Sequence, residues 1–386
     1  MDLSYCTNVH PAEDLRGVLA QLDRFALPVR RLLGVDHLGL GLWLSADVAR
    51  GLAGDEASRR RLRAELDARG LEVRTLNAFP YGGFHDAVVK HSVYRPRWTD
   101  PERLRYTTDC ATVLGDLLPD TAESGSISTL PLGWRTPWTP SDDTLAFAAL
   151  DEMARVLRAQ AAWTGRPIAL AVEPEPGCVL DTVHDAVSRL AGRVDPEHVG
   201  ICLDTCHLAV SFADPAAAVA EIRAAGLRVV KVQASAALEV TRPGTPESRR
   251  ALAAFTEPRY LHQVRELSGG LVLASDDLPQ AHQELPGRDP WRVHFHVPLH
   301  ARPAAPLSAT TDVLRDAVRA LAADGPLPHV EVETYTWSVL PGAVGQDDTA
   351  LVRGIAAELR WAREHLGVLE TAVPAGDLTV EEGARP

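Results

Sequence analysis

The sequence is poor in cysteine, and its cysteines are badly spaced for a covalent framework. Five occur in 386 residues, an odd number, and no two of them form a Cys-x-x-Cys pair. Disulfide-stabilised folds need an even set of cysteines, and structural zinc sites usually use paired ones. We therefore expect neither a disulfide framework nor a structural zinc site.

Basic residues are outnumbered by acidic ones. The chain has 39 Lys and Arg against 52 Asp and Glu, which gives a formal net charge of −13 at pH 7. Proteins that bind nucleic acid concentrate Lys and Arg, because contacts to phosphates release counterions. Nucleic acid is therefore not expected as a partner, and we interpret the densest basic cluster, at residues 59–63, as a solvated helix face.

Long apolar runs are missing as well. No run reaches the roughly 18 apolar residues of a membrane span, and the first residues have neither the basic nor the apolar region of a signal peptide. We expect a cytoplasmic protein without a membrane span, and a homo-oligomer is left open. The composition, 46% hydrophobic and 24% charged, is ordinary for a globular protein.

Short segments rich in Val, Ile and Leu alternate with longer segments of helical spacing. This alternation is typical of β/α units. Strands are predicted at residues 2–9, 36–44, 71–79, 126–132, 167–173, 198–204, 227–234 and 328–334. Eight such strands with intervening helices predict the α/β fold class and, within it, a (β/α)8 TIM barrel.

The alternation is interrupted before the last predicted strand. Residues 239–306 exceed the usual helix and short loops, so we predict an insertion there between strands seven and eight. It contains an apolar run, residues 291–298, which we interpret either as a ninth strand or as a continuation of barrel strand seven. A single domain is expected over residues 1–370, followed by a disordered tail at residues 371–386.

Carboxylates stand where three of the predicted strands end. Glu173 follows the fifth strand, Asp204 the sixth and Glu333 the eighth. Barrel enzymes place their reactive groups at these strand ends, and buried carboxylates that converge need a compensating cation. Oxygen ligands favour Mn²⁺ or Mg²⁺, and nearby histidines leave Zn²⁺ open. The alternative is a satisfied polar network without metal.

Two other acidic residues have competing interpretations. Glu175 is either a supporting group of the site or a cap for the helix that begins near Asp181. Glu331 lies deeper on its strand, where pairing with Lys231 and metal binding are both open.

Three short motifs carry a resemblance. They are Glu-Pro-x-Pro beginning at Glu173, Leu-Asp-Thr-x-His around Asp204, and the strand-eight Glu333. Together they resemble the xylose-isomerase-like barrel superfamily, which includes sugar isomerases and epimerases, inosose and dehydroshikimate dehydratases and an abasic-site endonuclease. The resemblance implies that the three carboxylates are metal ligands and that His207 faces the substrate.

The fourth metal ligand implied by this resemblance departs from the commonest pattern. Epimerases of the superfamily often use a histidine on strand seven, whereas the matching residue here is Gln233. Some dehydratases of the superfamily use glutamine at this position. His296 is the alternative ligand if the late apolar run belongs to the barrel.

Four further segments, residues 6–11, 79–85, 294–298 and 333–337, resemble the metabolite traffic proteins of the bacterial ebo operon. This resemblance implies a small-molecule partner, a sugar, sugar phosphate or cyclitol. The residues expected to contact it are His10, Tyr81, His85, His296 and Trp337, although anchoring of loops is an alternative role for the aromatic ones.

The leading functional hypothesis is a metal-dependent isomerase, epimerase or dehydratase. Glu173 or Glu333 would act as a base next to a carbonyl, with His207 as the complementary acid. The alternative is a protein that binds or carries a metabolite without converting it, because a fold alone does not determine function.

Overall fold

The computed structural model describes residues 3–323, 325–342 and 347–367. The predicted tail therefore lies outside the described residues. No helix in the described ranges is both long enough and apolar enough to span a membrane.

Eight parallel strands close into a barrel, in the order β1-β13-β7-β6-β5-β4-β3-β2. They are β1 Leu3–Cys6, β2 Leu38–Trp43, β3 Leu71–Asn77, β4 Gly125–Thr129, β5 Ile168–Val172, β6 Val199–Asp204, β7 Val229–Ala234 and β13 His329–Val332. Each lies within one or two residues of a predicted strand, or inside it. The prediction of a TIM barrel is confirmed.

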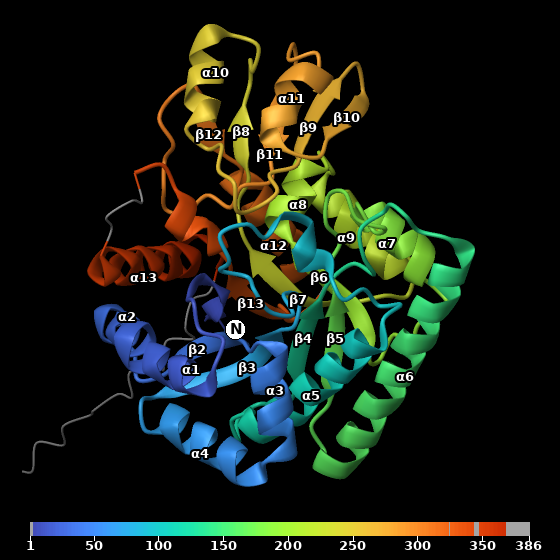
Figure 1. Ribbon diagram of the computed structural model, residues 1–386, viewed down its shortest axis with the longest axis vertical. Coiled ribbons are helices and arrows are strands. Elements are labelled where there is room, and N and C mark those ends of the chain that lie inside the picture. The colour runs from blue at the N-terminus through green and yellow to red at the C-terminus, as the bar shows by residue number, and fades with distance from the viewer. Residues whose placement is uncertain (1–2, 324, 343–346, 368–386) are drawn as a thin grey trace, which may run out of the picture.

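Helices surround the barrel, as Figure 1 shows. They are α1 Leu15–Gln21, α2 Leu27–Leu33, α3 Ala46–Gly54, α4 Glu56–Asp67, α5 Pro101–Leu117, α6 Pro140–Thr164, α7 Val183–Leu190, α8 Thr205–Val210, α9 Pro215–Ala224, α12 Thr311–Ala322 and α13 Asp348–His365. The ends have local causes. Thr139 and Asp142 form a reciprocal capping box at the start of α6, and Gly165 ends that helix in the left-handed conformation, with φ of 69°.

The insertion carries a second sheet of its own, with the strand order β10-β9-β11-β8-β12. Its elements are β8 Leu238–Val240, α10 Pro246–Ala253, β9 Val264–Ser268, β10 Leu271–Ser275, α11 Leu278–Glu284, β11 Trp291–Val293 and β12 Leu307–Ala309. All of its strand pairs are antiparallel. In Figure 1 it stands above one end of the barrel.

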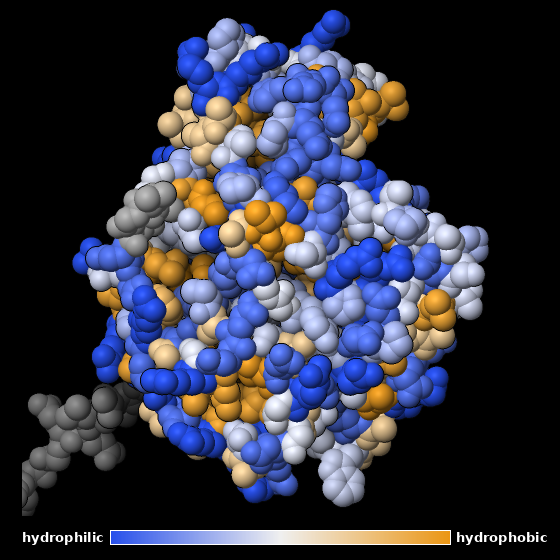
Figure 2. All heavy atoms as spheres, in the orientation of Figure 1, coloured by the Kyte–Doolittle hydropathy of each residue, from blue (hydrophilic) through white to orange (hydrophobic). Residues whose placement is uncertain are grey.

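The late apolar run therefore forms β11 of this second sheet. Its interpretation as a continuation of barrel strand seven is wrong, because Trp291 and Val293 pair with β8 and β9 and not with a barrel strand. Trp291 and Phe295 are fully buried in a hydrophobic core that belongs to the insertion. The hairpin of β9 and β10 exposes Leu271 and Val272. Figure 2 shows hydrophobic atoms at the surface of this part of the insertion, at the upper right.

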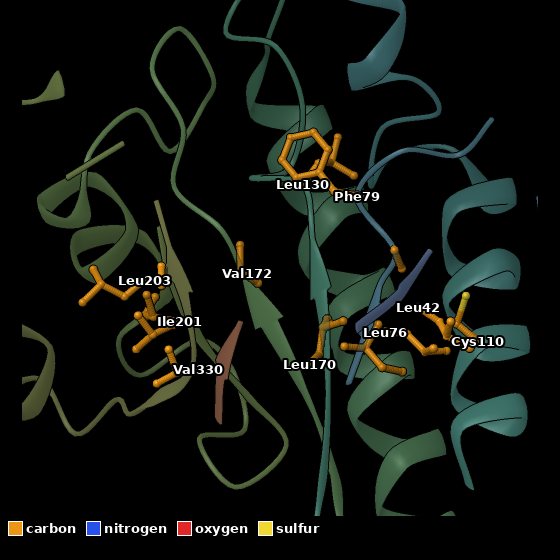
Figure 3. Close-up of a cluster of buried hydrophobic side chains, with 14 of the residues drawn as sticks. Leu42, Leu76, Phe79, Cys110, Leu130, Leu170, Val172, Ile201, Leu203 and Val330 are labelled. Atoms are coloured by element: carbon orange, nitrogen blue, oxygen red, sulfur yellow. The ribbon is translucent and has the colours of Figure 1, made fainter. Parts of the chain in front are cut away.

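The main hydrophobic core lies between the barrel and its helices. Leucine, isoleucine and valine side chains of the strands, such as Leu42, Leu76, Leu170 and Ile201, are buried in it (Figure 3). Burying these side chains is the main stabilising contribution of the barrel, at about 25 cal/mol for each Å² of apolar surface removed from water.

The barrel interior, in contrast, is polar. Lys231 Nζ lies 2.6 Å from Glu331 Oε2 and donates to Ser128 Oγ at 3.2 Å, and both members of the ion pair are fully buried. Of the two predicted alternatives for Glu331, the structure has the pairing with Lys231. Gly41 leaves room for this pair, because a Cβ atom there would lie 1.2 Å from Glu331 Oε1.

Candidate active site

Three carboxylates meet at the end of the barrel that faces the insertion. Glu173 directly follows β5, Asp204 ends β6 and Glu333 directly follows β13. Each offers an oxygen atom within 4.8 Å of those of the other two, and their exposed fractions are 3%, 2% and 5%. The three residues that the motifs single out are thus brought together in a buried cluster.

Two asparagines hold Glu333. Asn8 Nδ2 donates to its Oε1 at 2.8 Å, and Asn77 Nδ2 donates to the same oxygen at 2.9 Å. Asn8 lies in the turn after β1, and Asn77 is the last residue of β3. Sequence reasoning did not select them as site residues, although both follow the same rule as the carboxylates, polar residues at strand ends.

Asp204 is held on one side and free on the other. Its Oδ1 accepts from the backbone N–H of His207 at 2.9 Å and from Ser235 Oγ at 2.8 Å. Its Oδ2 is buried without a partner in the described part of the chain, and the same is true of Glu173 Oε2. Buried carboxylate oxygens without donors are costly unless a cation or proton compensates them.

Two candidate fourth ligands lie next to Asp204. Gln233 on β7 stands beside it in the strand register, and both amide atoms of Gln233 are buried without partners among the described residues. His296, from the insertion, donates through Nδ1 to the backbone oxygen of Glu333 at 2.7 Å. Its Nε2 therefore carries a lone pair, has no hydrogen-bond partner, and lies 3.9 Å from Asp204 Oδ2.

Burial and mutual repulsion change the acidity of these groups. Burial, with the nearby Asp204 charge adding to it, raises the pKa of Glu333 to about 8. Burial and the carboxylates of Glu333, Asp204 and Glu175 raise the pKa of Glu173 well above its ordinary value. The pKa of His296 falls to about 4, mainly through burial. This donor set of oxygen and neutral nitrogen atoms suits a divalent cation.

Two histidines face each other above the carboxylates. His207 donates through Nδ1 to the backbone oxygen of Pro174 at 2.9 Å, and His294 donates through Nδ1 to Gln263 Oε1 at 2.7 Å. Their Nε2 atoms are 3.0 Å apart. Because both Nδ1 atoms donate to oxygen atoms, one Nε2 atom must donate to the other across this distance, so the two rings share a proton beside the carboxylates.

A cavity lies above this cluster, with a polar floor and an apolar upper wall. The floor includes Glu173, Glu333 and His207. The wall is made by aromatic and aliphatic side chains from the loop after β3, the insertion and the turn after β13: Phe79, Phe84, Val89, Val93, Tyr94, Tyr260, Leu261 and Tyr335. The insertion therefore completes the cavity as well as supplying His294 and His296.

Glu175 also lines this cavity. Its Oε1 accepts from Tyr94 Oη at 2.7 Å, and burial raises its pKa to about 7. The predicted alternative role, as a cap for the next helix, belongs instead to Thr182, whose side chain accepts from the backbone of Asp185 at the start of α7.

Four of the five residues predicted to contact a ligand do not line the cavity. His10 stacks on Phe25 at a ring distance of 4.1 Å and is fully buried among hydrophobic residues. Tyr81, in the loop after β3, packs edge-on against Tyr106 of α5. Neither placement supports the predicted ligand contact.

The other two are turned into loop contacts. His85 Nε2 donates to the backbone oxygen of Asn8 at 2.7 Å, so this ring fastens the loop after β3 to the turn after β1. The Trp337 ring packs over Gly354 of α13, and its Nε1 donates to Glu358 at 3.0 Å. His296 is the one predicted contact residue that lines the cavity.

Comparisons with known proteins agree with this architecture. A family described as the xylose isomerase-like TIM barrel matches residues 31–253. No curated protein sequence matches the chain.

Among solved structures, the IolI protein with a bound zinc atom is 13% identical, with 96% of this chain and 100% of that one covered and a TM-score of 0.53. D-psicose 3-epimerase from Clostridium cellulolyticum H10, solved with D-tagatose, is 18% identical, with 95% and 99% covered and a TM-score of 0.51. At such identities the likeness establishes the fold alone.

Proposed function

Because the chain belongs to the xylose isomerase-like TIM barrel family, we propose that it is a divalent-metal-dependent isomerase or epimerase of a polyhydroxylated carbonyl compound. The observation that carries this proposal is the set of unpartnered, buried polar atoms at the carboxylate cluster. Glu173 Oε2, Asp204 Oδ2 and His296 Nε2 all belong to it. The zinc-bound and sugar-bound relatives of the same fold agree with a metal and a sugar-like substrate.

Glu173, Asp204 and Glu333 would hold the metal ion. Gln233 and His296 are both placed beside Asp204, and we propose that both complete the ligand set, one from the barrel and one from the insertion. Three carboxylates with one amide oxygen favour Mn²⁺ or Mg²⁺, and the imidazole nitrogen admits Zn²⁺.

When bound, a divalent cation would supply a Lewis acid that polarises the substrate carbonyl and makes the neighbouring carbon more acidic. The chain's own groups would do the rest. Glu173, which has a free oxygen, would remove the proton from one face of this carbon. Glu333, fixed by its two asparagines, would donate a proton to the opposite face. His207, which is hydrogen-bonded to His294 through the Nε2 atoms, would act as the complementary acid or orient a substrate hydroxyl.

Two finer alternatives belong to the same proposal. Gln233 in place of a strand-seven histidine is a feature that the chain shares with some dehydratases, and loss of a β-hydroxyl from the same carbanion would give dehydration. A role in an ebo-type pathway, with a cyclitol as substrate, rests on the four matching segments. The apolar cavity wall is also compatible with a carrier that binds its metabolite without converting it.

One experiment separates these readings. The metal content of the purified protein is measured, and exchange of the proton next to the carbonyl is then followed in D₂O with a panel of keto-sugars and keto-cyclitols. We expect bound metal and deuterium incorporation. Glu333→Gln should slow exchange by at least about 100-fold, while Glu197→Gln, an exposed carboxylate at the other end of the barrel, should leave it unchanged.

The outcomes are distinct. Tight ligand binding to the metal-loaded protein without any proton exchange would favour the carrier. Full exchange by a Glu333→Gln variant that retains its metal would contradict the catalytic role of Glu333.

A further inference from the structure

A buried carboxylate on helix α13 forms hydrogen bonds with two chain segments next to the candidate site. Glu358, in the middle of α13, is 1% exposed. It is the only acidic residue of that helix that is buried; Asp348 and Glu364 lie at or near the surface. The neighbouring residues that face the barrel, Ile355 and Leu359, are apolar.

Three donors from two segments of the chain converge on this carboxylate. The backbone N–H of Leu299 donates to Oε1 at 3.0 Å, and the Thr334 hydroxyl donates to the same oxygen at 2.6 Å. The Trp337 indole N–H donates to Oε2 at 3.0 Å. The carboxyl group accepts three directional hydrogen bonds here, which an apolar side chain could not accept.

Two of these donors lie close in sequence to proposed metal ligands. Thr334 directly follows Glu333, and Leu299 lies three residues after His296. The two ligands are themselves joined, because His296 Nδ1 donates to the backbone oxygen of Glu333. One carboxylate on α13 therefore ties together the segment that leaves the insertion and the segment that leaves the last barrel strand.

The helix itself is fixed against the same turn. Trp337 packs over Gly354, where a Cβ atom would lie 2.2 Å from the indole ring. Gly354 and Glu358 are one helical turn apart, so the ring and its N–H contact neighbouring positions on one face of α13. These contacts fix the position of Glu358 relative to the turn that contains Trp337.

The cost of burial indicates that this carboxylate is not a simple packing residue. Burial raises the pKa of Glu358 to about 7, so ionising it at neutral pH opposes stability. An apolar side chain at this position would avoid that cost, but it would leave the donors of Leu299, Thr334 and Trp337 without this acceptor. The directional bonds to Leu299 and Thr334 are what the carboxylate adds.

We propose that Glu358 is a positioning residue that sets the spacing between Glu333 and His296, and thereby the affinity of the site for its metal ion. This inference rests on the proposed function, because it takes those two residues as ligands. Glu358 would act through Thr334 and Leu299, without touching metal or substrate.

The test compares metal affinity with stability in four variants of the full chain. Mn²⁺ and Zn²⁺ binding to the chelator-stripped protein is measured by calorimetry, and unfolding is followed by denaturant. Glu358→Ala should weaken binding about tenfold, as loss of outer hydrogen bonds typically does at metal sites. Leu359→Ala, which removes packing from the same helix, should lower stability without changing the affinity.

Two conservative variants give a rescue. In Glu358→Gln, the amide oxygen can still accept from Leu299 and Thr334, but the amide N–H₂ group faces the Trp337 N–H, so two donors oppose each other. Affinity should fall by a few fold. Adding Trp337→Phe removes the opposing donor, and the double variant should bind metal more tightly than Glu358→Gln alone.

The inference is overturned if Glu358→Ala and Leu359→Ala change affinity equally, or if Glu358→Ala leaves affinity unchanged. It is also overturned if Trp337→Phe gives no rescue. Failure of the unaltered protein to bind any divalent ion is a different result, because that contradicts the proposed function itself.

Discussion

Replacing Lys231 by Met should destabilise the protein strongly, because it leaves a buried charge without its partner. Lys231 and Glu331 are both fully buried, with 2.6 Å between Nζ and Oε2. Glu331 cannot turn towards solvent, since it occupies the space that Gly41 leaves inside the barrel. Removing one partner of a buried pair typically costs about 3–5 kcal/mol. We expect a loss in this range for Lys231→Met at pH 7.

The magnitude is measured as the free energy of unfolding from urea titrations. The matched control is the double variant Lys231→Met, Glu331→Gln, in which no unpaired charge remains. It should be more stable than Lys231→Met alone, with a coupling energy of about 2 kcal/mol or more between the two positions. If the effects were additive and the double variant less stable than either single variant, the unpaired charge of Glu331 would not be the cause of the destabilisation.

Three further predictions concern the site. Burial raises the pKa of Glu333 to about 8, so the carboxyl group of the unfolded chain ionises at lower pH than that of the folded one. The free energy of unfolding of the metal-free protein should therefore fall by about 3–5 kcal/mol between pH 5 and pH 8. In urea titrations at pH 8, an added divalent ion should restore this loss. Asn77→Leu removes a donor to Glu333 and should weaken Mn²⁺ binding about tenfold by calorimetry, whereas an unchanged affinity would exclude a role for Asn77 in holding that ligand. In equilibrium dialysis, a phosphorylated keto-sugar should bind less tightly than its unphosphorylated form. Among the described cavity residues only Lys90 has a Lys or Arg charge, and its Nζ is already paired with Asp277 at 2.6 Å. Equal or tighter binding of the phosphorylated sugar would contradict this prediction.

The barrel and its carboxylates could be predicted because the information is local. The apolar strand Ile168–Val172 is followed directly by Glu173. In a closed parallel barrel the carboxyl ends of all strands lie at the same end of the barrel, so residues that follow the strands come together there. Asn8 and Asn77 follow the same rule and could have been selected with it. Their amides are a weaker signal than carboxylates, because asparagine is common in turns for reasons of backbone conformation.

His296 was proposed as an alternative ligand from the family resemblance, but a strand-end position predicts neither His296 nor the other site residues of the insertion. His294 and Gln263 reach the site only because a second sheet forms and stands over the barrel mouth, and neither follows a barrel strand. Trp337 shows the opposite case. It closely follows a barrel strand, yet the 3-10 turn Tyr335–Val339 and the gap at Gly354 direct its ring onto α13.

The hydrogen bond between Asn8 and Glu333 joins residues 325 positions apart. The ribosome makes Asn8 long before Glu333, so this hydrogen bond cannot form until residue 333 has emerged. Contacts of such sequence separation form late, after the entropy of closing the long loop has been overcome. An ion that binds only the closed barrel would then favour closure by mass action, and its capture would mark the moment at which folding is finished.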